Sequence, residues 1–294
     1  MGKDIKSLRT RIKSFDSTLH LTGAMGLVAS SKIKRAYDAM AASREYSKAI
    51  TDLTTRLISC PECRKSPYFG KPAEPQDIEE EQETKTEKVR LIVIAGDRGL
   101  CGGYNANVFR TVRDMGEVEI HPIGKRSYAR YHNEPEEMGE EFDPDSGYLS
   151  SEYYTIEEAQ EEAAICCKDF IEGRIDKVGI VYNRYVSIIS QEPDVFWILP
   201  LTHKEDSGAD AGIYEPAPDE LLESFIPEYF AGKLFALVKE SFACEVAARR
   251  MAMDSAKKNA QQMIDDLTLE YNRARQGTIT QEITEIVAGS NAQS

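Results

Sequence analysis

The sequence predicts an α/β protein in which N- and C-terminal helices form a long antiparallel coiled coil carrying an inserted Rossmann-like open-sheet domain. Heptad-spaced small and apolar residues fill both ends of the chain, almost without proline. Strand and helix patterns alternate between these ends. Because two long helices each need a partner for their seam, pairing them with each other is the simplest arrangement.

The N-terminal helix is expected from residue 4 to residue 58, where no proline interrupts spacings of three and four residues. Three small residues in mid-seam, Thr22, Gly26 and Ala29, allow two interpretations. Either the two helices approach closely, or a smooth shaft turns inside a sleeve of other chains. The predicted seam is Ile5, Leu8, Ile12, Phe15, Leu19, Thr22, Gly26, Ala29, Ile33, Ala36, Met40, Ser43, Ser47, Ile50, Thr54 and Leu57.

The C-terminal helix is expected from about residue 219 to residue 287, with Pro218 in its first turn, where a missing N–H is tolerated. Its seam is less regular. The predicted members are Val246, Met253, Ala256, Ala260, Met263, Leu267, Ala274, Ile279, Ile283 and Ile286.

The middle of the chain has the pattern of a parallel or mixed sheet with helices on its faces. Five strands are expected, at residues 89–95, 118–123, 177–182, 186–191 and 195–199. Helices are expected up to residue 115 and over residues 125–132 and 156–171. The resulting division is 1–58 (N-terminal helix), 59–88 (acidic connector), 89–204 (Rossmann-like domain), 205–217 (linker) and 218–294 (C-terminal helix).

Composition and charge exclude several classes of protein. The net charge of -14 over 294 residues argues against a protein that coats nucleic acid. No signal peptide or membrane-spanning segment is evident, so we expect a cytosolic chain with no direct membrane insertion. Residues 3–56 have 11 basic and 5 acidic residues, a net charge of +6 that predicts an acidic partner. The acidic stretches 74–87 and 133–162 are interpreted as solvated surface.

The sequence predicts no catalytic, cofactor-binding or metal-binding residue. The glycines at 96, 99, 102 and 103 fit neither the Gly-x-Gly-x-x-Gly spacing nor that of a phosphate-binding loop, the two patterns typical of nucleotide sites. The histidines at 20, 121, 132 and 203 lack ligand spacing. Cys60 and Cys63 form only half of a zinc or redox site and are expected to be inert thiols, so that serine at either position has little effect.

Several motifs resemble those of the gamma subunits of F-type ATP synthases, in family order and over nearly the whole chain. The loop of residues 97–105 and the run from Ala274 to Gly289 carry the strongest resemblance. Further matching segments are residues 22–32, 191–193 with 199–201, 214–216, 247–249 and 251–253.

The resemblance implies a rotor shaft without catalytic residues or cofactors. In that family, the shaft turns inside a ring of alpha and beta subunits, and its foot contacts the epsilon subunit and the membrane rotor c-ring. Its rotation couples transmembrane proton or sodium flow to ATP synthesis or hydrolysis at the beta subunits. The chain would then sit peripherally at the cytoplasmic face of the cell membrane.

The resemblance also implies individual contacts. Arg275, Gln276 and Thr280 match positions that hydrogen-bond to loops of the catalytic ring. Met25, Lys32 and the loop of Cys101 match the region that faces an acidic segment of beta.

An alternative is a stand-alone α/β protein with a helical dimerisation stalk. It would bind a small-molecule anion at the turn of residues 96–103. The unsuitable glycine spacing argues against it.

Overall fold

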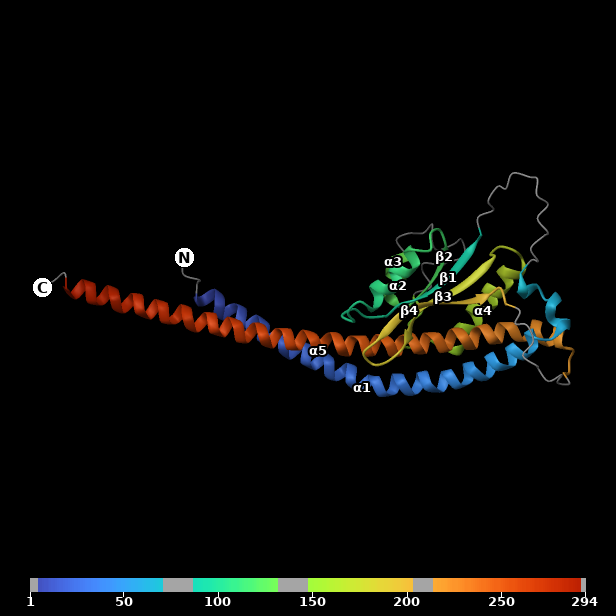
Figure 1. Cartoon of the computed structure of the whole chain (residues 1–294), viewed down its shortest axis with the longest axis horizontal. Helices are drawn as coiled ribbons and strands as arrows, with labels where there is room; N and C mark the ends of the chain where they lie inside the picture. The colour runs from blue at the N-terminus through green and yellow to red at the C-terminus, as the bar shows by residue number, and fades with distance from the viewer. Residues whose placement is uncertain (1–4, 71–86, 132–147, 203–213, 292–294) are drawn as a thin grey trace, which may run out of the picture. The chain divides into compact units, whose positions relative to one another are not determined.

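The computed structural model describes residues 5–70, 87–131, 148–202 and 214–291 (Figure 1). Much of the two acidic stretches and of the expected linker lies outside these residues. The chain forms two compact units, one of Met1–Ser31 with Arg249–Ser294 and the other of Lys32–Ala248. None of the helices in the described ranges has the length and apolarity needed to cross a membrane.

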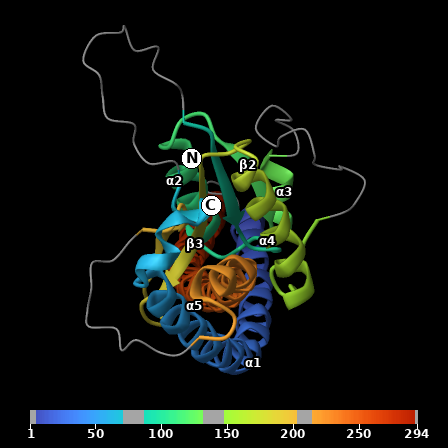
Figure 2. The same cartoon turned by 90° about the vertical axis from the view of Figure 1, so that its right-hand side faces the viewer.

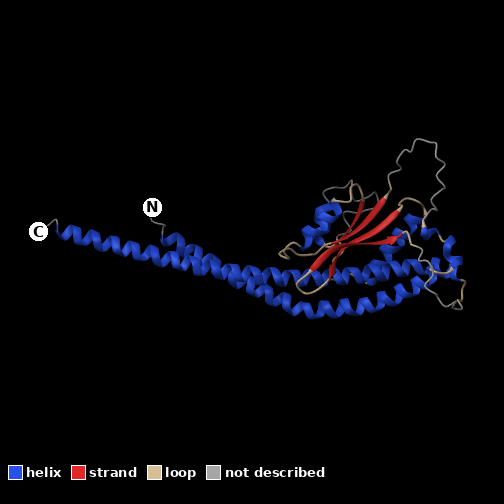
Figure 3. Ribbon diagram, in the orientation of Figure 1, coloured by secondary structure: helices blue, strands red, loops and turns tan. Residues whose placement is uncertain are grey.

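Two long helices, α1 (Ile5–Ile58) and α5 (Pro218–Asn291), contribute to both units (Figure 3). Every predicted seam residue of α1 is buried or half-buried. In the smaller unit, a Cβ placed on Gly26 would lie 3.6 Å from the Cβ of Met253. The small residues of the α1 seam therefore face α5 and permit close approach, the first of the two interpretations.

The seam of α5 departs from the prediction at Met263, which is 49% exposed. Ile264 is half-buried instead, and Ala260 and Leu267 on either side are buried. A straight α-helix has 3.6 residues per turn, so a strict heptad drifts around its surface. Ile264 lies four residues after Ala260, so it returns to the buried side of α5 that Met263 has left.

The sheet has the order β2-β1-β3-β4. Strand β1 (Val89–Ile94) pairs in parallel with β2 (Glu119–Ile123) and β3 (Lys177–Tyr185), aligning Leu91 with Ile120 and Gly179. Strand β4 (Gln191–Leu199) is antiparallel to β3. Of the two strands predicted here, the one at 195–199 lies within β4, but the one at 186–191 is wrong. Residues 186–190 turn the chain, with the N–H groups of Val186 and Ser187 donating to the carbonyl of Ser190.

Alternate residues of β1 face opposite sides of the sheet. Leu91 and Val93 belong to a core shared with α2 (Tyr104–Arg113) and α3 (Lys125–Tyr131). Ile92 and Ile94 belong to the core shared with α4 (Ile156–Ile171), α5 and the end of α1. In the larger unit, α5 therefore lies between the sheet and α1 (Figures 1 and 2).

Two short 3₁₀ helices, η1 (Pro61–Lys65) and η2 (Pro67–Phe69), follow α1. Cys63 is fully buried in the core beneath them, whereas Cys60 is half-buried at the helix end. Both thiols are free. This difference in burial separates two cysteines that the sequence treats alike.

Candidate partner-contact site

The C-terminal end of α5 packs against nothing among the described residues. Every side chain described from residue 275 to residue 288 is exposed, whereas Ala274 is half-buried. The prediction that Ile279, Ile283 and Ile286 continue the seam is therefore wrong for the isolated chain. The described part of α1 begins at Ile5, and it provides no surface to cover them.

The exposed end carries polar and apolar groups on one side. At 100° per residue, seven positions fall within about 140° of the helix circumference. The hydroxyl of Thr280 donates to the carbonyl of Gln276 at 2.9 Å, so the helix itself orients it. We call this surface the tip face; it comprises Arg275, Gln276, Ile279, Thr280, Ile283, Ile286 and Val287. The structure thus places three predicted contact residues together.

Met25 lies in the same unit, on α1, and is half-buried. Its neighbours Leu21, Leu27 and Val28 are exposed, although each is a large apolar side chain. The seam of α1 does not use these positions. This part of α1 therefore also offers an apolar surface that the described residues leave uncovered.

Lys32 and the loop after β1 come together in the larger unit. The Nζ of Lys32 lies 2.5 Å from Oε1 of Glu152. The N–H of Glu152 donates to Oδ2 of Asp97 at 3.1 Å, and Arg98 is 3.9 Å from the Glu152 carboxylate. One acidic residue thus connects two regions that the sequence predicted separately.

Cys101 itself lies under this loop, with only 3% of its surface exposed. Its thiol accepts from the amide of Asn105 at 3.2 Å. The outer surface of the loop is Leu100, which is 63% exposed and has a positive φ of 61°. A left-handed backbone at a leucine is strained, so the fold holds this side chain outward at some cost.

The glycine-rich turn is filled by carboxylates of the chain itself. Asp97 accepts from the N–H of Lys125 at 3.0 Å and from the hydroxyl of Ser150 at 2.7 Å. The carboxyl group of Glu245 lies 2.6 Å from where a Cβ on Gly96 would be. These negative charges occupy the place at which the alternative interpretation puts an anion, and they disfavour one there.

Gly124, directly after β2, lies where the loop after β2 closely approaches the loop after β1. Its φ is +93°, and an added Cβ would lie 2.0 Å from the carbonyl oxygen of Ala95. Only glycine fits such a position. The N–H of Gly124 donates to Leu149 at 2.7 Å, and this contact holds the segment of Ser150 beside Asp97.

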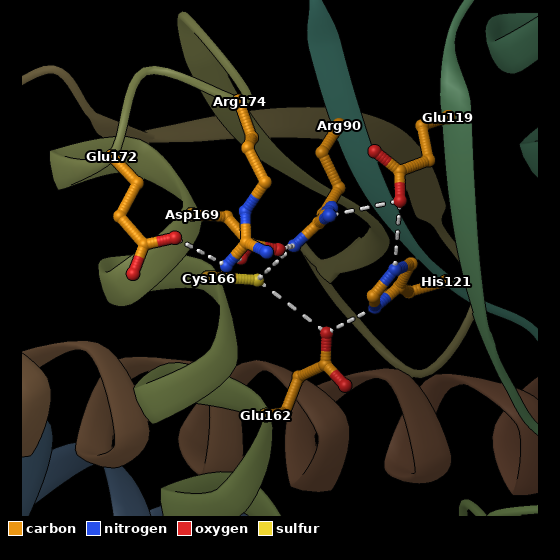
Figure 4. Close-up of polar contacts among 8 residues, drawn as sticks. All are labelled: Arg90, Glu119, His121, Glu162, Cys166, Asp169, Glu172 and Arg174. Carbon is orange, nitrogen blue, oxygen red and sulfur yellow. Dashed lines mark hydrogen bonds and ion pairs between the residues drawn. The ribbon is translucent and has the colours of Figure 1, made fainter. Parts of the chain in front are cut away.

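A separate charged network joins β1, β2 and α4 (Figure 4). The buried guanidinium of Arg90 lies 2.5 Å from Asp169 and 2.9 Å from Glu119. His121 is 2.6 Å from Glu162 and 3.3 Å from Glu119. Arg174 completes the network by pairing with Asp169 and, at 2.9 Å, with Glu172.

The charges of this network shift the pKa values of its members. Burial alone would lower the pKa of His121, but Glu162 and Glu119 raise it to about 9. Burial alone would raise the pKa of Glu119, but hydrogen bonds from His121 and Arg90 lower it to about 2. His121 is therefore a cation at neutral pH, held between two carboxylates.

His121, Glu162 and Cys166 place nitrogen, oxygen and sulfur atoms within 4.8 Å of one another. Burial, followed by the charge of Glu162, raises the pKa of the Cys166 thiol well above its usual value. Arg90 approaches the sulfur at 3.9 Å. A metal ion there needs a thiolate and a neutral imidazole, and it would face the Arg90 charge. The arrangement is better explained as an ion-pair network. Sequence reasoning missed it because its members are dispersed along the chain.

Comparison with known proteins identifies the family. The model of a family described as ATP synthase matches residues 4–293. An ATP synthase gamma chain from Moorella thermoacetica is 35% identical over 294 residues, covering 98% of both chains. The chain belongs to the ATP synthase gamma family.

Solved structures agree with this family in fold. A chain of the Euglena gracilis mitochondrial ATP synthase (OSCP/F1/c-ring, rotational state 3) has a TM-score of 0.63 and 20% identity, covering 98% of this chain and 94% of that one. A chain from the Tetrahymena thermophila enzyme (central stalk/c-ring) has a TM-score of 0.56 and 20% identity, covering 80% and 99%. Gamma subunits are non-catalytic. Of the predicted contact residues, Arg275, Gln276 and Thr280 are exposed, Met25 and Lys32 are half-buried, and Cys101 is buried.

Proposed function

We propose that this chain is the central-stalk gamma subunit of an F-type ATP synthase. In this role it turns within the ring of alpha and beta subunits and couples proton or sodium flow to ATP synthesis or hydrolysis. Its other partners are the epsilon subunit and the membrane c-ring. The complex holds the chain peripherally, at the cytoplasmic face of the cell membrane.

The exposed tip face of α5 is the observation that carries this proposal. An amphipathic helix end with several exposed isoleucines is unfavourable in water and is stabilised by burial against other chains. The polar members Arg275, Gln276 and Thr280 lie among these isoleucines. They make directional contacts to the catalytic ring, while the apolar members keep water out.

A second contact region forms around Met25, Lys32 and the loop of Cys101. Because the Cys101 thiol is buried, Leu100 is the side chain of that loop which reaches the partner. Lys32 already pairs with Glu152. An acidic segment of beta competes with Glu152 for this charge, so each contact is weak and can exchange as the shaft turns.

A double substitution in the tip face tests the proposal. The complex is reconstituted from purified alpha and beta subunits with the chain carrying Arg275→Ala and Gln276→Ala. Hydrogen bonds to charged groups contribute about 1.5–3 kcal/mol each, so we expect ATP hydrolysis to fall about tenfold or more.

The matched control carries Lys257→Ala and Lys258→Ala, which remove exposed charges from the same helix outside the tip face. Both variants of the isolated chain should unfold at the wild-type temperature. Normal hydrolysis by the Arg275→Ala, Gln276→Ala complex would remove the tip face from the coupling contact.

A further inference from the structure

Within the larger unit, α5 buries polar side chains in the middle of an apolar segment. The segment from Leu234 to Ala247 packs between the sheet and α1, yet it contains two buried carboxylates. We call the buried polar group the polar lock. It comprises Glu240, Ser241, Cys244 and Glu245.

Glu240 connects α5 to two other elements. Its carboxylate accepts from the backbone N–H of Tyr185, at the end of β3, at 2.8 Å. It also accepts from the guanidinium of Arg44, on α1, at 2.8 Å. A single side chain therefore fixes α5 against the sheet on one side and against α1 on the other.

Ser241 and Cys244 make the next contacts toward the C-terminus. The Ser241 hydroxyl lies 2.7 Å from the hydroxyl of Tyr104, on α2, and accepts from the N–H of Asn183 at 3.4 Å. The Cys244 thiol donates to the carbonyl of Asn183 at 3.3 Å. The backbone of β3 is thus held on both its N–H and its C=O.

Glu245 completes the group at the loop after β1. Its carboxylate accepts from the N–H of Arg98 at 3.4 Å and lies directly against Gly96. Any side chain at Gly96 would collide with it. The glycine-rich turn therefore makes room for a residue of α5.

These contacts differ physically from the apolar packing around them. Apolar contact is non-directional, so a helix can turn slightly while burying a similar area. A buried carboxylate, in contrast, loses its donors when the helix turns, and leaving it unpaired is costly. The partners of the polar lock come from α1, α2, β3 and a loop, so turning α5 breaks several contacts together.

We propose that the polar lock fixes the angle of α5 about its own axis relative to the sheet, so that torque passes from the sheet and its flanking helices to α5 without slip. This inference rests on the proposed rotor function. The lock residues are positioning residues, since they act through α5 and not on nucleotide.

Torsional stiffness of the assembled alpha/beta/gamma complex tests the proposal. A bead is attached through Lys168→Cys, an exposed position on α4, and turnover is stopped with a non-hydrolysable ATP analogue. The angular variance of the bead varies inversely with torsional stiffness. In the Glu240→Leu, Ser241→Ala variant we expect this variance to rise about twofold, because the directional contacts are lost.

Two variants separate the lock from general stability. Glu240→Gln keeps an oxygen for the Tyr185 N–H and should retain the wild-type variance. Val238→Ala removes fully buried apolar volume next to the lock. The Val238→Ala variant should have a lower melting temperature but the wild-type angular variance. If the lock only stabilised the fold, the variance would rise in Val238→Ala as well.

The outcomes are distinguishable. Wild-type variance in the Glu240→Leu, Ser241→Ala complex, or an equal rise in Val238→Ala, would overturn the proposal. If Glu240→Leu prevents assembly, Tyr104→Phe with Ser241→Ala decides in the same way, since it removes only hydroxyl groups. If the bead fails to rotate with ATP on the complex whose lock residues are unchanged, that result would instead contradict the rotor function itself.

Discussion

The larger unit (Lys32–Ala248) and the C-terminal end of α5 use polar residues in opposite ways. In the larger unit, charged side chains such as Arg90, Asp169 and Glu240 are buried and paired within the chain. At the end of α5, Arg275 and Gln276 are exposed, beside isoleucines that no other described residue covers. The first region stabilises this chain. The second contributes almost nothing to its own stability, which indicates that its contacts are made with other chains.

Substitution of Arg90 should produce the largest loss of stability. Arg90→Met removes the buried cation that pairs with Asp169 and Glu119, and it leaves the Asp169 carboxylate with only the half-exposed Arg174 as an ion-pair partner. Breaking a buried ion pair in this way costs about 3–5 kcal/mol. We expect the melting temperature of the isolated chain to fall by roughly 10 °C.

Arg184→Met is the matched control, because it removes an exposed pair with Glu192 at 2.7 Å. That change should cost about 0–1 kcal/mol. Equal losses in the two variants would show that burial does not set the strength of the Arg90 network.

The pH dependence of unfolding should come from buried charged side chains of the larger unit. The pKa of His121 is raised to about 9. Protonated His121 therefore contributes fully to the free energy of unfolding below the unfolded pKa of about 6.5. This contribution, about 3 kcal/mol in all, is lost as the pH rises through 9. The pKa of Glu119 is lowered to about 2, so its contribution is present above about 4.5 and is lost as the pH falls toward 2. Urea unfolding at several pH values measures both slopes. A His121→Gln variant that kept the alkaline loss would contradict this assignment.

The two cysteines after α1 give a smaller difference. Cys63→Ser buries a hydroxyl in an apolar core and should cost about 1–3 kcal/mol. Cys60→Ser, at the half-buried position, should change stability by less than about 0.5 kcal/mol. Thermal melts under reducing conditions compare them. This revises the expectation from the sequence, which treats the two thiols as equally inert.

Substitutions in the tip face should have the smallest effect on the isolated chain. Ile279→Ser with Ile283→Ser removes apolar groups that are already exposed. We expect the free energy of unfolding to stay within about 0.5 kcal/mol of wild type. Binding to the alpha/beta ring should weaken in the same variant. A large loss of stability would mean that the chain covers these residues itself.

Local patterns made the fold largely predictable. The heptads of α1 identify its buried side because spacing along a helix determines which residues share a face. The strands β1, β2 and β3 follow from short apolar runs. At β4 the same reasoning failed, since the exposed apolar residues Val186, Ile188 and Ile189 resemble a strand but form a turn.

The site was less predictable because it depends on contacts between distant residues. Nothing local shows that His121 meets Glu162, or that Glu245 lies against Gly96. One signal was present for the polar lock, namely acidic residues within an otherwise apolar helical run. The tip face was recognisable only by family resemblance, because no local pattern shows that the described residues leave it exposed.

Reconstitution of the wild-type chain with purified alpha and beta subunits tests whether the chain acts as a rotor. Stoichiometry and ATP hydrolysis are measured with and without the chain. The rotor account predicts one copy in each alpha/beta ring and hydrolysis that depends on its presence. A chain that stays apart from the ring and associates with itself would contradict that account.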